Sequence, residues 1–134
     1  MNTATGNRVP SWFWIVALLA LAWEAFGAYT YVSQSMVPDG QREGDYATMQ
    51  SWQWGLFATA VWSGVAGAVA LLLRSRWATA LLLLSFLAAV FLYGYAALNG
   101  GLSAEARPIA ISVMVVGVIL VMLSSRARRA GWLH

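Results

Sequence analysis

The sequence contains no cysteine, no lysine and a single histidine. The absence of cysteine excludes disulfide bonds, thiolate metal sites and cysteine nucleophiles. The chain also lacks a clustered set of metal ligands, a serine–histidine–acid constellation and a glycine-rich phosphate loop. We therefore predict no enzyme activity, no metal site and no cofactor.

Charged residues are also scarce, at 10% of the chain, whereas 60% of the 134 residues are hydrophobic. This composition is too apolar for an ordinary soluble domain. All eight basic residues are arginines that lie between apolar runs, so nucleic acid is not an expected partner. We predict an all-α protein: residues 1–134 form a single integral membrane domain, a four-transmembrane-helix bundle in contact with membrane lipids.

Four apolar runs are long enough to cross a bilayer, since about 20 residues rising 1.5 Å each cover the ~30 Å hydrocarbon core. We predict spans at 12–32, 54–73, 77–98 and 108–123. The first run continues to Val32, which is too long for a signal peptide, so we expect it to be retained. The connection at 74–76 is so short that the second and third spans must be antiparallel neighbours.

The arginines predict the orientation of the chain, because basic residues concentrate in cytoplasmic loops. Six lie on one side of the predicted spans: Arg8, Arg74, Arg76, Arg126, Arg128 and Arg129. Only Arg42 and Arg107 lie on the other side, so we predict that both termini are cytoplasmic in a multi-pass protein of the bacterial inner membrane. Tryptophans mark the same interfaces: Trp12, Trp14, Trp77 and Trp132 on the cytoplasmic side, Trp52 and Trp54 on the outer side.

Arg126, Arg128 and Arg129 form a basic cluster after the last span. The cluster is either an anchor for anionic lipid headgroups or a simple determinant of orientation.

Glu24 is the only residue among the acids, arginines and histidine that falls within a predicted span. Inserting such a carboxyl group into lipid costs roughly 2.5 kcal/mol or more, so we expect it to face protein or water. Helical spacing puts it on one face with the small residues Ala17, Ala20 and Gly27. Desolvation favours its neutral form. Two interpretations stay open: a carboxyl group that binds a ligand or a proton, or a neutral group that hydrogen-bonds two helices together.

A few side chains capable of hydrogen bonding lie at the predicted depth of Glu24. They are Thr59, Trp62 and Ser63 in the second span, Tyr93 in the third and Ser112 in the fourth. We predict that they form a polar pocket with Glu24. Trp23 and Trp62 could add aromatic walls for a cation or serve only in packing. Small residues allow helices to approach closely, and the predicted packing glycines are Gly27, Gly64, Gly67 and Gly117.

Three segments, SWFWIVALLALAWEAFGAYTY, GVAGAVALLLRSRWA and ARRAGWL, resemble a group of small four-helix bacterial inner-membrane proteins of poorly defined function. Some members of that group are labelled sugar transporters. Two shorter segments, ALAWEAFG and AVWSGVAG, are similar to motifs of the small multidrug resistance transporters. That resemblance implies a homodimer in which Glu24 binds protons and cationic drugs in exchange, with Trp62, Ser63 and Gly64 lining the site. The second motif lies here on the second span, whereas that family has it on the third.

Two functions from different classes follow. The first is a small-solute or cation transporter that uses the intramembrane carboxylate of Glu24, working as a homodimer. The second is a non-catalytic accessory or assembly subunit of a larger membrane complex. The buried acid and the resemblances favour the first function, and the small number of polar residues in the spans favours the second.

Overall fold

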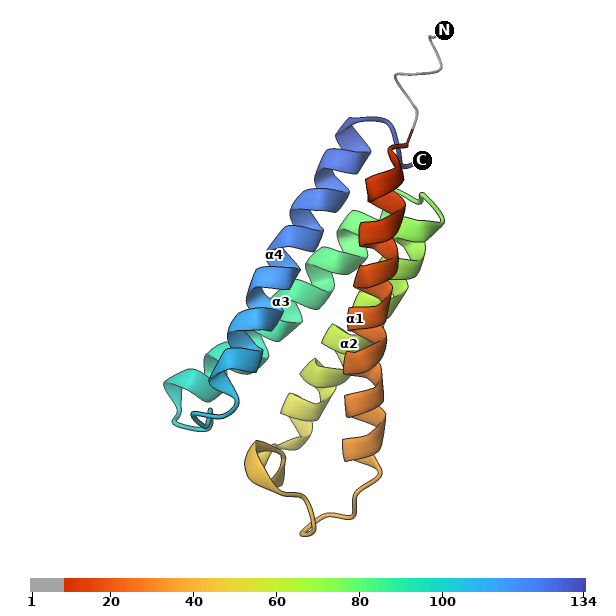
Figure 1. Cartoon of the computed structure of the whole chain (residues 1–134). Coiled ribbons are helices and arrows are strands. Elements are labelled where there is room, and N and C mark those ends of the chain that lie inside the picture. The colour runs from red at the N-terminus through yellow and green to blue at the C-terminus, as the bar shows by residue number, and fades with distance from the viewer. Residues whose placement is uncertain (1–8) are drawn as a thin grey trace, which may run out of the picture.

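The computed structural model describes residues 9–134 and consists of four long helices (Figure 1). In chain order they are α1 (Ser11–Ser35), α2 (Ser51–Leu72), α3 (Trp77–Leu98) and α4 (Arg107–Arg129), with a short 3-10 helix, η2 (Gly44–Thr48), between α1 and α2. All four long helices have the length and apolar composition needed to cross a membrane. The predicted all-α architecture with four candidate spans is confirmed. Arg8, which we counted in the orientation, lies outside the described residues.

The helix boundaries follow from local chemistry at each end. α3 begins and ends where the sequence predicts. α2 begins at Ser51, before the predicted residue 54, because Gln50 and Gln53 exchange side-chain and backbone hydrogen bonds in a capping box. α4 continues to Arg129 instead of ending near residue 123. Its last turn carries the arginine cluster, whose charge complements the negative end of the helix dipole.

The helices pack in sequential order, with α1 on α2, α2 on α3 and α3 on α4. Gly67 allows α2 and α3 to approach closely, because a Cβ atom there would lie 2.8 Å from Leu82 Cγ and 3.1 Å from the Leu82 backbone nitrogen. Gly117 of α4 is similarly covered by the ring of Phe86. Gly27 differs, since a Cβ atom there would make only an ordinary 3.8 Å contact. The pair α1–α2 and the pair α3–α4 diverge toward the end that carries η2 (Figure 1).

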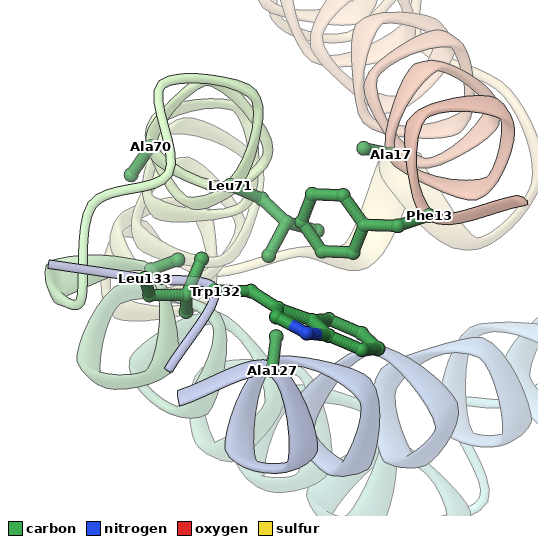
Figure 2. Packing of buried hydrophobic residues seen from close by; sticks show 8 residues of the cluster. Phe13, Ala17, Ala70, Leu71, Ala127, Trp132 and Leu133 are labelled. Atoms are coloured by element: carbon green, nitrogen blue, oxygen red, sulfur yellow. The ribbon is translucent and has the colours of Figure 1, made fainter. Parts of the chain in front are cut away.

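The opposite end of the bundle is closed by an apolar cluster that includes Phe13, Leu71, Ala127 and Trp132 (Figure 2). The Trp132 ring lies edge-on to the Phe13 ring, with 5.7 Å between centroids. The start of α1, the α2–α3 turn and the C-terminal residues therefore meet at one end of the molecule.

Trp132 reaches this cluster because the chain reverses at Gly131, whose φ is 82°. Hydrogen bonds then hold the last residues against the α2–α3 turn. The His134 amide donates to the Arg74 carbonyl at 2.8 Å, and the Arg76 amide donates to the His134 carbonyl at 3.1 Å. The prediction that Trp132 marks a lipid interface is therefore wrong, since its side chain is buried in the protein.

Candidate functional site

Glu24 lies where three helices meet. Its carboxyl group, carried by α1, rests against the backbone of Gly64 on α2. A Cβ atom on Gly64 would lie 2.6 Å from Glu24 Cδ and 2.9 Å from Ser85 Oγ on α3. Only glycine leaves space at this position for both the carboxyl group and the serine hydroxyl.

A cavity of about 350 Å³, here called the inner cavity, has Glu24 on its wall. All four long helices contribute to the lining, together with Tyr46 of η2. Much of the lining is aromatic: Trp23, Phe26, Tyr46, Phe57, Phe86 and Tyr93. The volume lies at the lower end of the range found for small-molecule sites, and an apolar lining with a few polar groups is typical of such sites.

The serine and threonine hydroxyl groups that line the inner cavity have hydrogen-bond partners within residues 9–134, whereas the Glu24 carboxyl group does not. The Ser85 hydroxyl donates to the Ala60 carbonyl at 2.5 Å, and the Thr30 hydroxyl donates to the Phe26 carbonyl at 3.0 Å. Within residues 9–134, the Glu24 carboxyl group accepts no hydrogen bond, and the single ion pair joins Arg42 to Asp39. A buried carboxylate needs a partner to stay ionised. Glu24 therefore either holds a proton or needs a cation that residues 9–134 do not supply.

A larger cavity of about 980 Å³, here called the vestibule, occupies the end of the bundle that carries η2. Tyr46, Phe57, Leu92, Tyr93 and Ile109 line both cavities, so the two adjoin. The vestibule wall carries three acids and one arginine, namely Glu43, Asp45, Glu105 and Arg42. An excess of acids in a hollow raises the local concentration of cations.

Hydrogen bonds tie together the two connections that form the vestibule. The Asp45 carboxylate accepts from the amide of Ser103 at 3.3 Å and from its hydroxyl at 3.1 Å. Arg42 donates to the Gln34 carbonyl at 3.0 Å and lies 4.7 Å from the centre of the Trp54 ring. The vestibule is therefore bounded by side chains with fixed partners.

Of the predicted site residues, Trp23 and Tyr93 lie with Glu24 in the lining of the inner cavity. Four others lie outside it: Thr59, Trp62, Ser63 and Ser112. The three hydroxyl groups instead donate to carbonyls one helical turn earlier, those of Gly55, Thr59 and Pro108. Trp62 is 47% exposed, and its ring packs against that of Tyr31. Roles in binding for all of these residues stay predictions.

Ser85 is one of the cavity residues that the sequence did not predict, together with Thr30 and Tyr46. One signal was available, because Ser85 is the only serine in the apolar run 77–98. Ser85 and Tyr93 lie more than two helical turns apart on α3, so the predicted depth of Glu24 matched the tyrosine and not the serine.

The arginine cluster lies far along α4, at the end opposite the vestibule. Arg126, Arg128 and Arg129 are exposed in the last turns of the helix. The Arg126 guanidinium lies 5.8 Å from the centre of the Trp12 ring. Their role as a lipid anchor stays a prediction.

No protein-family model, no curated protein and no solved structure matches this chain.

Proposed function

We propose that this four-span membrane protein binds a small cation at Glu24 and transports it. The observation that carries the proposal is the position of Glu24, the only acid in the four spans, on the wall of a cavity that adjoins an acid-rich vestibule. The vestibule would gather cations, and the carboxylate would hold one in the inner cavity. Aromatic rings around the carboxylate add cation–π attraction.

Exchange with a proton follows from the chemistry of a half-buried acid in a mostly apolar cavity. A neutral Glu24 holds a proton on the same oxygen atoms that an ionised Glu24 would present to a cation. Because no residue within 9–134 neutralises the carboxylate, the proton and the cation compete for one site. Such competition is the minimum requirement for coupling cation movement to a proton gradient.

The arginine distribution supports an orientation within the bacterial inner membrane. The end closed by Phe13 and Trp132 also carries the exposed arginine cluster of α4 and the α2–α3 turn. We assign this end to the cytoplasm under the positive-inside rule. The vestibule then faces the outside, and the last turns of α4 contact anionic lipid headgroups.

Flux through proteoliposomes tests the proposal. Two labelled cations, benzylguanidinium and benzyltrimethylammonium, are supplied outside vesicles that have an acidic interior. We expect uptake of at least one of them above that of empty vesicles, with its loss in Glu24→Gln. Ser124→Ala is the control, because it replaces a buried polar side chain that lines neither cavity.

The outcome that contradicts the proposal is equal uptake by wild type, Glu24→Gln and empty vesicles. In that case the alternative function, an accessory or assembly subunit, is tested by purification in a mild detergent. Larger membrane subunits would co-purify with an accessory protein, whereas a transporter would be recovered alone or as a homodimer.

A further inference from the structure

The groups that surround the Glu24 carboxyl group offer acceptors to a ligand. The hydroxyl hydrogen of Ser85 is used by the Ala60 carbonyl at 2.5 Å, so Ser85 can present only a lone pair to the inner cavity. Thr30 has the same limitation, because its hydrogen is used by the Phe26 carbonyl. Together with the carboxylate, these side chains make a set of oxygen acceptors on two helices, α1 and α3.

Three donor-capable side chains also line the inner cavity, namely Trp23, Tyr46 and Tyr93. Within residues 9–134, none of the three donates a hydrogen bond to the Glu24 carboxyl group. Tyr46 and Tyr93 line the vestibule as well, so they lie where the two cavities adjoin. The ligand itself must therefore supply donors to the carboxylate.

We infer that the inner cavity selects cations that carry N–H donors, bound by the Glu24 carboxylate and the Ser85 hydroxyl oxygen, over quaternary cations of the same charge. This inference rests on the proposed function. An ammonium or guanidinium group pairs with both oxygen acceptors, and a guanidinium can engage the carboxylate with two parallel bonds. A quaternary ammonium presents only methyl groups, which leaves these half-buried acceptors without partners.

Binding to the full-length protein in lipid nanodiscs, measured by isothermal titration calorimetry, tests the selection. The probes are benzylguanidinium and benzyltrimethylammonium, which share a charge and an aromatic body. We expect benzylguanidinium to bind at least about tenfold more tightly than benzyltrimethylammonium. Only benzylguanidinium can donate hydrogen bonds to the charged carboxylate, and such bonds are stronger than those between neutral groups. Ser85→Ala should weaken benzylguanidinium binding roughly three- to tenfold and leave binding of benzyltrimethylammonium unchanged.

Ser124→Ala is the matched control for Ser85→Ala. Ser124 is a buried serine that donates to a helix carbonyl, but it lies outside the inner cavity. Its replacement should change the affinity for neither cation. If Ser85→Ala does not fold, the comparison of the two cations on the wild-type protein still decides the question.

Two failures can be told apart. Equal affinities for the two cations, both lost in Glu24→Gln, would overturn the inference and leave the proposed function standing. Binding of neither cation, or binding that Glu24→Gln does not change, would overturn the proposed function together with the inference.

Discussion

The carboxyl group of Glu24 on α1 lies directly against the backbone of Gly64 on α2, with Glu24 Cδ only 2.6 Å from the position that a Cβ atom on Gly64 would occupy. The acid and the glycine are therefore one structural unit. The carboxyl group fills the space that the missing side chain leaves, and the glycine lets the two helices approach while the acid stays between them.

Gly64→Ala should destabilise the protein by about 1–3 kcal/mol, because the new methyl group overlaps both Glu24 and Ser85. The measurement is the free energy of unfolding from SDS titration. Gly55→Ala in the same helix is the control, since a Cβ atom there meets no atom within 4 Å and alanine has the higher helix propensity. Adding Glu24→Ala to Gly64→Ala should recover much of the loss. No recovery would show that the two residues are not coupled.

Gly67→Ala should be costly and Gly27→Ala nearly neutral, although the sequence suggests packing roles for both. A methyl group on Gly67 would collide with Leu82, including its backbone nitrogen, which cannot move away as a side chain can. We expect a loss of about 1–3 kcal/mol for Gly67→Ala in the same titration. Equal effects of the two substitutions would contradict the close approach of α2 and α3 at this point.

Trp132→Ala should lower the free energy of unfolding by about 3 kcal/mol, because it empties the centre of the apolar cluster at the closed end. Trp77→Ala is the control, since that ring is 70% exposed. A Trp132→Ala protein as stable as Trp77→Ala would mean that the C-terminal residues do not fold back onto the bundle.

Alkaline pH should destabilise the wild-type protein more than Tyr46→Phe. Burial, and then the nearby Asp45 carboxylate, raise the pKa of the Tyr46 phenol, which lies in η2 outside the spans. A group with a raised folded-state pKa stabilises the protein fully below its unfolded pKa, and this stability is lost as pH rises through the folded pKa. The difference between the two proteins in SDS titration should therefore change only above about pH 10. A difference that is the same at pH 8 and pH 11 would exclude this role.

The sequence was sufficient to predict the four long helices. Runs such as 77–98 are apolar over their whole length and long enough to cross a bilayer, which is enough to predict a helix there. The direction in which each helix faces could not be predicted in the same way. Ser63 and Ser112 lie outside the inner cavity. The sequence could not predict this, because an all-apolar helix has no pattern that distinguishes its inner face from its lipid face.

The position of Trp132 required tertiary information as well. Its place in the apolar cluster depends on the reversal at Gly131 and on hydrogen bonds to the α2–α3 turn, which is distant in the sequence. A tryptophan near the end of a span looks the same in sequence whether it meets lipid or protein.

The most direct test of the account is the chemical accessibility of position 24 from water. The chain contains no cysteine, so Glu24→Cys and Ala25→Cys each carry a single thiol. Ala25 is the next residue along α1, is exposed and lines neither cavity. The two proteins are treated in lipid vesicles with a trimethylammonium-ethyl or a sulfonato-ethyl methanethiosulfonate.

We predict that the cationic reagent modifies Glu24→Cys faster than the anionic reagent does, because the vestibule is acidic. Ala25→Cys should react with neither reagent, since its thiol faces acyl chains. Modification of Ala25→Cys as fast as that of Glu24→Cys would contradict the claim that the carboxyl group of Glu24 faces a cavity within the bundle.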